Sequence, residues 1–437
     1  MRKPSGLLIA VGLLVILAVG IFISNKKQAA KEKAPATDTK KVVNIPDSDV
    51  QAIRIQKSSG ETLELKKDGK WAITQPKPMP ADQDSVSSLV SSVDSVTIDS
   101  TIEEKATDLS PYGLVKPSLE VQVTPKNGKM VTLQIGDDTP TGSGAYAKLA
   151  EDPHVYTIGS FVKSSVDKKP DDLRDKRLLT FDQDKLTRVE LVAKGQPVEF
   201  GKNNQNEWTI LRPKPLRADA TAVDGLVNKL KDAKMDLTLT PDEAAKKFAG
   251  ATRVATATVT DQSGSQTLEV RKDKDNNYYA KSSVVEGIYK VSSDVGDGLN
   301  KGLDDFRNKK LFDFGFSDPT KLEVKGATYT KSGDKWMSGS KTMDNGSVQN
   351  LIDKLRDLTA TKFAETGGGQ PVFDATVTSN NGKRVEKVTI TKLGDKYFAQ
   401  REGEPSIYEL DGKAVEDLQK AASDVKEAPP AAPTKKK

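Results

Sequence analysis

Serine–lysine pairs at a three-residue spacing are the first feature of this chain that could do chemistry. In such a pair the lysine amine can take the proton of the serine hydroxyl and so create a nucleophile. The spacing recurs along the chain, for example at Ser160–Lys163, Ser165–Lys168 and Ser332–Lys335. A spacing that recurs in unrelated stretches is typical of chance, so we expect none of these serines to be catalytic.

The chain has only one histidine, His154, which limits the kinds of catalytic and metal site that it can form. Catalytic triads and multi-histidine metal sites both need imidazole groups. The chain has no cysteine, which excludes disulfides and thiolate metal sites. His154 directly follows Asp152 and Pro153, so we predict a solvated residue in a hairpin turn. No Gly-Lys pair is followed by serine or threonine, which excludes a phosphate-binding loop of that type.

Two further stretches imitate ligand-binding loops without completing the pattern. Residues 296–302 are rich in glycine but are one residue too long for a dinucleotide fingerprint. Residues 273–277 begin like a calcium loop, but Tyr278 stands where glycine is needed and Val284 where the closing glutamate should be. We predict a simple turn at 273–277. We therefore expect no catalytic residue, no cofactor and no metal, although folding could still bring two scattered carboxylates together.

The elements around these residues form a repeat marked by the three tryptophans of the chain, Trp71, Trp208 and Trp336. Each tryptophan follows a polar turn and begins a short strand, with an amphipathic helix beyond it. The first two copies match at an offset of 137 residues without a gap. In each helix, apolar residues recur at i, i+3, i+4 and i+7, which is one helix face. An aspartate stands at each expected N-cap: Asp82, Asp219 and Asp344.

The tryptophans allow two interpretations. Exposed rings could stack on sugars and make each repeat a glycan-binding module of the cell wall. Trp71 and Ile73, however, lie on the same side of their strand, as do Trp208 and Ile210. This is the side that would pack against the apolar helix stripe. The pattern therefore favours burial of the rings in the cores of the repeats.

The second half of each copy predicts a β-hairpin followed by further strands. In the first copy, alternating residues 118–123 turn at Asn127 and Gly128 and return at 131–135.

We therefore predict an α+β fold of three tandem modules, each a bent antiparallel sheet with one or two helices on one face. We also expect helices at 172–178 and 305–311 to connect the repeats. The expected domains are a transmembrane anchor at 1–24, a disordered basic linker at 25–41, repeats at 42–180, 181–314 and 315–425, and a disordered tail at 426–437.

Residues 7–24 carry no charge. This run predicts a single transmembrane helix, because such a helix needs about 17–25 predominantly apolar residues. A cleaved signal peptide is the alternative, but its apolar core is typically about 7–15 residues long. We expect an uncleaved single-pass anchor with the body of the chain on the outer side of the membrane.

The formal net charge of +5 does not describe the folded body. Lysines and Arg2 at the two ends carry a net charge of about +9, which leaves about −4 for the body between them. A nucleic-acid binder would carry a basic patch on its folded domain. We therefore expect no nucleic-acid partner.

Three segments resemble a bacterial family of membrane-anchored repeat proteins with a domain of unknown function. The segments are residues 68–71 (Asp-Gly-Lys-Trp), 112–117 (Tyr-Gly-Leu-Val-Lys-Pro) and 173–179 (Leu-Arg-Asp-Lys-Arg-Leu-Leu). The genes of this family often lie beside those of gliding-motility-type ABC transporters. The resemblance covers about residues 42–425 and implies an envelope-facing accessory subunit, with no catalytic residues to carry over. The second and third copies lack the 112–117 segment, so the three copies need not be identical in fold.

From these observations we expect a non-enzymatic, membrane-tethered protein of the bacterial inner membrane with a periplasmic body. It would serve as a scaffold or accessory subunit of an ABC-type transport complex. Its expected partners are the membrane, through residues 7–24, and subunits of such a transporter. The alternative is an envelope module that binds carbohydrate or peptidoglycan. An enzyme that uses only aspartate, glutamate, lysine or tyrosine is a third hypothesis.

Overall fold

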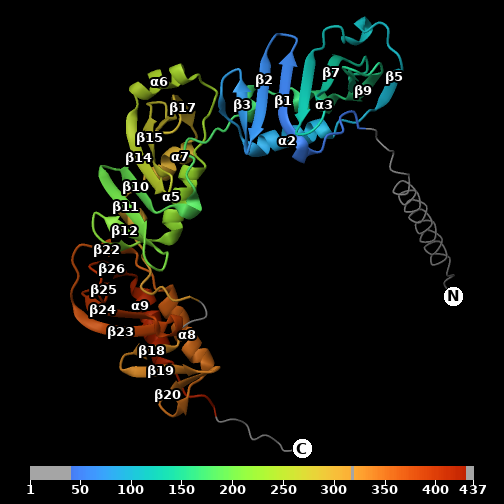
Figure 1. The fold of residues 1–437 in the computed structure, drawn as a ribbon. Coiled ribbons are helices and arrows are strands. Elements are labelled where there is room, and N and C mark those ends of the chain that lie inside the picture. Colours follow the sequence, from blue (N-terminus) through green and yellow to red (C-terminus); the bar gives the residue numbers. More distant parts are fainter. Residues whose placement is uncertain (1–40, 316–318, 430–437) are drawn as a thin grey trace, which may run out of the picture. The chain divides into compact units, whose positions relative to one another are not determined.

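The computed structural model describes residues 41–315 and 319–429. These residues form three antiparallel sheets, one after another along the chain, with short helices packed on them (Figure 1). The fold is therefore mostly β, and the predicted α+β class is wrong. The prediction underestimated the strands because several are only two to five residues long, too short to show an alternation of their own.

No helix in the described part of the chain is long and apolar enough to cross a membrane. The anchor predicted at residues 7–24 lies outside the described residues, as does the linker up to residue 40.

Residues 426–429 of the predicted disordered tail are part of the described fold, and residues 430–437 lie outside the described residues. Asp344 N donates to the carbonyl of Lys426 at 2.9 Å, and Ala428 N donates to the carbonyl of Thr342 at 2.9 Å. Residues 426–428 thus continue the edge of the third sheet. The sequence there is rich in alanine and proline. Because the segment is held by backbone hydrogen bonds, its side chains show no alternation from which a strand could be predicted.

The first sheet, in the first repeat, has the strand order β4-β3-β2-β1-β6-β7-β8-β9-β5. Strand β1 lies inside the sheet, between β2 and β6. The helices are α2 (Gln83–Asp94), α3 (Ser160–Val166) and α4 (Pro170–Leu173). The strands are β1 (Val50–Lys57), β2 (Thr62–Asp68), β3 (Lys70–Gln75), β4 (Met79–Pro80), β5 (Ser100–Glu103), β6 (Leu119–Pro125), β7 (Val131–Asp138), β8 (Gly144–Leu149) and β9 (Val155–Gly159).

The second sheet, in the second repeat, has the order β13-β12-β11-β10-β14-β15-β16-β17. The helices are α5 (Ala220–Lys231), α6 (Pro241–Ala249) and α7 (Ser293–Leu299). The strands are β10 (Arg188–Ala193), β11 (Gln196–Lys202), β12 (Trp208–Arg212), β13 (Leu216–Arg217), β14 (Thr252–Asp261), β15 (Gly264–Lys272), β16 (Tyr278–Ser282) and β17 (Ile288–Val291).

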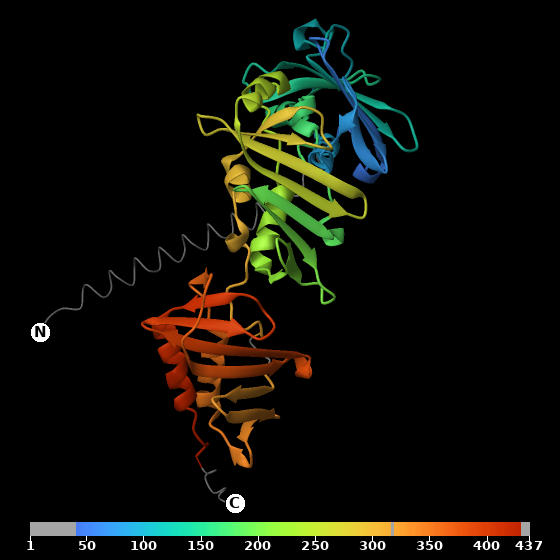
Figure 2. The same cartoon turned by 90° about the vertical axis from the view of Figure 1, so that its left-hand side faces the viewer.

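The third sheet, in the third repeat, has the order β21-β20-β19-β18-β23-β24-β25-β26-β22. Figure 2 shows α8 (Asn345–Asp357) and α9 (Gly412–Ser423) on one face of this sheet. The strands are β18 (Lys321–Val324), β19 (Ala327–Ser332), β20 (Lys335–Ser338), β21 (Lys341–Thr342), β22 (Lys362–Ala364), β23 (Gln370–Ser379), β24 (Arg384–Leu393), β25 (Lys396–Arg401) and β26 (Ile407–Leu410).

Each sheet buries one face against the apolar stripe of the helix that follows its tryptophan. Alternation along the strands supplies the buried side chains, as at Ile53 and Ile55 of β1. Each fully buried Val, Leu or Ile contributes roughly 1.5–3 kcal/mol relative to exposure. The predicted stripes are confirmed as the buried residues of α2 (Val86, Leu89, Val90, Val93), α5 (Val223, Leu226, Val227, Leu230) and α8 (Val348, Leu351, Ile352, Leu355).

The predicted N-caps and the predicted burial of the tryptophans are also confirmed. The carboxylate of Asp82 accepts a hydrogen bond from Ser85 N at 2.8 Å, and Asp219 and Asp344 cap α5 and α8 in the same way. Such a cap satisfies a backbone N–H that the helix itself leaves without a partner. Trp71, Trp208 and Trp336 are only 6%, 8% and 5% exposed.

The three sheets end differently at their last edge. In the first and third sheets a short strand, β5 or β22, pairs outside the final tyrosine-bearing strand. In the second sheet the corresponding chain makes a single bridge between Asp236 and Lys290 and then enters α6. Thr240 and Glu243 form a capping box at the start of α6. This sequence signal could have predicted the helix.

The predicted connecting helices are wrong. Helix α4 ends at Leu173, and Arg174 is already extended. Isolated β-bridges then join Ala81 to Arg174 and Ala218 to Arg307, at the edges of the first two sheets. Charged residues with good helix propensity suggested a helix here, but sheet-edge pairing overrides intrinsic propensity. The described chain forms two compact units, the first ending at Lys176 and the second beginning at Arg177.

Candidate functional site

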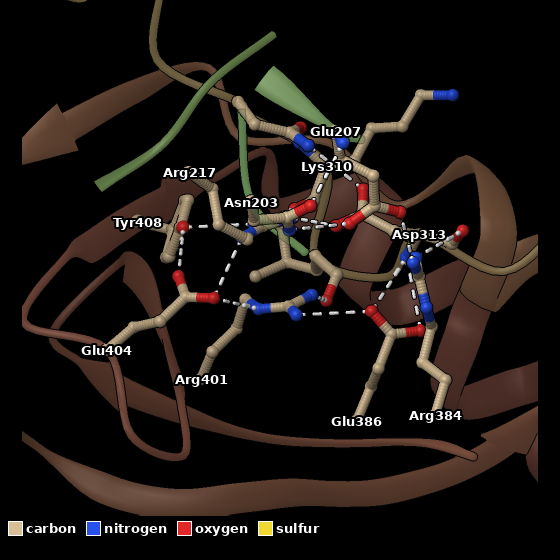
Figure 3. Close-up of polar contacts among 12 residues, drawn as sticks. Asn203, Glu207, Arg217, Lys310, Asp313, Arg384, Glu386, Arg401, Glu404 and Tyr408 are labelled. Atoms are coloured by element: carbon tan, nitrogen blue, oxygen red, sulfur yellow. Dashed lines mark hydrogen bonds and ion pairs between the residues drawn. The ribbon is translucent and has the colours of Figure 1, made fainter. Parts of the chain in front are cut away.

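A cavity of about 640 Å³ lies within the second compact unit, where its two sheets meet. The hairpin turn between β11 and β12 lines one side, and the turn between β23 and β24 lines another. The end of β13, the chain between the sheets and β25 supply the remaining walls. Figure 3 shows that arginines and carboxylates from these elements converge here.

Arg217 reaches this cavity because it is the last residue of β13, at the edge of the second sheet. One terminal nitrogen of its guanidinium pairs with the carboxylate of Asp313. The other donates to the carbonyl of Lys310 at 2.5 Å and to the hydroxyl of Tyr408 at 3.1 Å. Its Nε lies 2.8 Å from Glu404 Oε1, which makes an ion pair although the N–H is not aimed at that oxygen. The guanidinium thus joins groups from two segments of the chain.

Arg401 and Glu386 form the part of the network that belongs to the third sheet. Arg401 donates to Glu404 at 2.7 Å, to Glu386 at 3.1 Å and to the carbonyl of Leu311. Glu386 is almost fully buried, with 4% of its side chain exposed. It also accepts a hydrogen bond from Asp313 N at 2.9 Å. A carboxylate this deeply buried needs such partners, because an unpaired buried charge is very costly.

A third ion pair crosses the rim of the cavity. Arg384 lies at the start of β24 and donates to Glu207, in the β11–β12 turn, at 2.5 Å. It also donates to the carbonyl of Asp313 at 3.2 Å. Arg384 and Glu207 are 30% and 50% exposed, so solvent and salt screen this pair far more than the Arg217 contacts.

The electrostatics favour charged, paired arginines. Burial lowers the pKa of the Arg217 guanidinium, but Asp313, Tyr408 and Glu404 outweigh burial and hold that pKa above its ordinary value. For Arg384, burial likewise lowers the pKa, and the hydrogen bond to Glu207 raises it above its ordinary value. Burial also raises the pKa of the Tyr408 hydroxyl. Arg217 and Arg384 are therefore charged at neutral pH, and the Tyr408 hydroxyl keeps its proton.

This arrangement holds two sheets together through paired charges. Among the described residues that line the cavity, every carboxylate forms an ion pair with an arginine: Glu207 with Arg384, Asp313 with Arg217 and Glu386 with Arg401. A general acid or base must keep a proton-exchanging group within reach of a substrate. In the part of the chain that the structure describes, no group of three or more His, Cys, Asp or Glu side chains could hold a metal ion.

The tryptophans predicted as repeat markers do not come together in a site. Each lies in the hydrophobic core of its own repeat. Trp208 contributes to the wall of the cavity, but its Nε1 donates to Asp224 at 2.8 Å and the amine of Lys202 lies over its ring at 5.1 Å. Since the ring is buried and partly covered, it offers no open face on which a sugar could stack.

His154 is more engaged than the predicted solvated turn residue. Its Nδ1 contacts the carboxylate of Asp152, and its ring stacks on Tyr156 at 5.7 Å. The Tyr156 hydroxyl donates to the same carboxylate at 2.5 Å. Burial alone would raise the pKa of the Asp152 carboxyl. The hydrogen bonds from Tyr156 and His154 outweigh burial and lower this pKa to about 2. Burial and the Asp152 carboxylate raise the pKa of Tyr156 to about 12. The three side chains stabilise a turn.

The other motifs fold as structural elements. Residues 273–277 form the predicted turn, in which the Asp273 carboxylate accepts from the backbone N–H groups of Asp275 and Asn277 at 2.9 and 2.8 Å. Gly296 lies in α7, where an added Cβ would stand 2.1 Å from the Tyr278 ring. Within the described residues, no side-chain hydrogen bond joins serine and lysine in Ser160–Lys163, Ser165–Lys168 or Ser332–Lys335. The Lys163 amine, for example, donates to Asp138 at 2.8 Å.

Sequence reasoning missed the arginine network. Arg217 and Tyr408 are 191 residues apart, and no local spacing relates them. One signal was present. Arg217 stands 137 residues after Pro80 and so occupies the equivalent position of the second copy. Because the first copy has an uncharged residue there, the charge of Arg217 is not needed for the fold of a repeat. Tyr408 belongs to the tyrosines that recur near the end of each copy, with Tyr156 and Tyr289.

Comparison with known proteins supports the repeat. A family model described as a domain of unknown function, DUF4340, matches residues 71–247 and again residues 208–379. The two matches begin at Trp71 and Trp208, the same offset that relates the first two copies. No curated protein and no solved structure matches the chain.

Proposed function

This chain belongs to the family described as a domain of unknown function, DUF4340, and from that premise we propose that it is a non-enzymatic scaffold. In this proposal it serves as an accessory subunit of an ABC-type transport complex in the bacterial envelope. The family description assigns no reaction, so the proposal rests on the described site and on the sequence.

The observation that carries the proposal is the pairing of charges in the cavity. Asp313, Glu386 and Glu207 each lie on an arginine, and the arginines also donate to backbone carbonyls. Active sites commonly hold titratable groups that are available to a substrate. Here the groups are used to join two sheets, as expected of a protein whose work depends on a fixed shape.

Attachment to the membrane is the second part of the proposal. It is supported by the uncharged residues 7–24 and by the lysines that follow them. With such a tether, the body would remain within reach of neighbouring membrane proteins. The link to gliding-motility-type ABC transporters rests on the resemblance of the segments at 68–71, 112–117 and 173–179.

Affinity purification of the full chain from detergent-solubilised membranes tests the proposal. We expect subunits of an ABC-type transporter to be recovered with the chain, and to be lost when residues 7–24 are deleted. The alternative predicts a different outcome, in which the chain elutes alone but is retained on purified wall glycan. The burial of all three tryptophans gives that alternative no stacking surface, and recovery on glycan would contradict the scaffold proposal.

A further inference from the structure

We propose that the second and third repeats form one rigid body, held by the chain between them and by the guanidinium of Arg217. The segment between these two repeats, residues 306–314, is called the second connector, because it is the second of the two segments that link successive repeats. The inference concerns the mechanics of the second compact unit and does not depend on the proposed function. Three independent observations support it.

The second connector is fixed in a hydrophobic core at both of its ends. Phe306 is fully buried in the core of the second repeat, where its ring packs on Phe200 at a centroid distance of 4.9 Å. Leu311 and Phe312 are buried in the core of the third repeat. Only a few residues separate these anchors, and an extended chain spans at most about 3.3–3.6 Å per residue. The two cores are therefore held close together.

The backbone between these anchors pairs with both sheets or their adjoining loops. Arg307 forms a β-bridge with Ala218, beside the edge of the second sheet, and Lys310 forms one with Thr359, just after α8. Leu311 N donates to the carbonyl of Leu358 at 3.0 Å, and Ala360 N donates to the carbonyl of Lys309 at 2.9 Å. Backbone pairing with the second repeat extends to Asn308 and pairing with the third begins at Lys309, so no unpaired residue separates the repeats as it would in a flexible linker.

Side chains hold the same junction from the other direction. Arg217 leaves the second sheet and contacts Glu404 and Tyr408 of the third repeat, as well as the connector. Arg307 stacks on the ring of Phe363 at 3.3 Å and donates to Ser406 at 3.0 Å. Guanidinium groups suit this role because their planar donors reach several acceptors at once. Separation of the repeats would leave partly buried charges without partners.

The rim pair between Glu207 and Arg384 is secondary. It is half exposed on the glutamate side, and exposed ion pairs are worth little. Among the ion pairs of the junction, that of Arg217, whose side chain is 19% exposed, therefore contributes more than this rim pair. Pro80 stands at the equivalent position of the first repeat and carries no guanidinium, so this device belongs to the second compact unit.

Spin labels on the two facing hairpins test the proposal. The chain has no cysteine, so the full chain in detergent can carry cysteines at Asn204 and Lys383 alone. These positions lie on the β11–β12 and β23–β24 turns, one in each repeat. Pulsed electron resonance should give one narrow distance distribution. In Arg217→Ala the distribution should broaden about twofold or more, as expected when a fixed junction becomes a hinge.

Matched variants keep the test falsifiable. Arg271→Ala removes a similarly buried arginine whose contacts, Glu269 and Phe248, lie within the second repeat, and it should leave the distribution narrow. Glu207→Gln should also leave it narrow. A second label pair at Asn204 and Gln262, both in the second repeat, shows whether Arg217→Ala still folds. The proposal is overturned if Arg217→Ala stays narrow, if Arg271→Ala broadens equally, or if the second pair broadens as well.

Discussion

The guanidinium of Arg217 donates to the hydroxyl of Tyr408 at 3.1 Å and so connects an edge strand of the second sheet to a strand of the third. The hydroxyl in turn donates to Glu404 at 2.9 Å. Tyr408 is 1% exposed, and its ring packs beside Phe363 at 5.4 Å. The hydroxyl is therefore a buried polar group that depends on partners from both repeats.

Tyr408→Phe should destabilise the protein by about 1–2 kcal/mol, because it removes hydrogen bonds to two charged side chains while it preserves the buried ring. Urea unfolding followed by the fluorescence of Trp336 measures this loss. Tyr156→Phe removes the equivalent tyrosine hydroxyl of the first repeat and serves as the control. The Trp336 transition should be unchanged in the control, and an equal shift in both variants would contradict the assignment.

The second and third repeats should unfold together. Each repeat has its own tryptophan, so variants that keep only Trp208 or only Trp336, with phenylalanine elsewhere, report on the repeats separately. We expect the same urea midpoint from both reporters, because the junction couples the repeats, and different midpoints once Arg217→Ala is added. Distinct midpoints in the parent chain would show that the repeats are independent.

Removal of a tryptophan ring should be costly at all three positions. Replacement of Trp71, Trp208 or Trp336 by alanine removes a buried ring and should cost about 3–5 kcal/mol. Differential scanning calorimetry measures this against phenylalanine variants, which should lose less. A loss below about 1 kcal/mol at any position would mean that the ring is not part of the core.

The first repeat should lose stability in acid through Asp152. The pKa of this carboxyl falls from its ordinary value of 3.8 to about 2 in the folded protein. A lowered pKa stabilises the folded state above the unfolded value, and this contribution is lost as the pH falls from about 4 to about 2. Thermal unfolding of the first repeat at each pH should show this loss, and Asp152→Asn should show much less of it. Parallel curves for both proteins would contradict the prediction.

Local sequence patterns predicted what depends on neighbouring residues. The carboxylate of Asp82 caps α2 because it lies just before the helix, and the buried stripe of α2 follows from the spacing of its own residues. The burial of Trp71 follows in the same way from its alternation with Ile73. Each of these features is decided within about a dozen residues of chain.

The features that were missed depend on distant partners. Strand β5 pairs with β9, far along the sequence, and its four residues show no strand pattern. The segment after Leu173 looked helical because its charges and leucines have good helix propensity, yet Arg174 pairs with the sheet edge at Ala81. The contacts of Arg217 follow from the assembly of two complete repeats. Such contacts can be recognised only after the sheets are placed.

Sedimentation of solubilised membranes tests the central claim, that this chain is a subunit of a larger envelope assembly. Detergent extracts are separated on a gradient and the fractions identified by mass spectrometry. The account predicts that the full chain, whose own mass is 47.3 kDa, migrates with subunits of an ABC-type transporter. A chain that lacks residues 7–24 should instead migrate alone, at slightly less than this mass. Migration of the full chain alone at that mass would contradict the account.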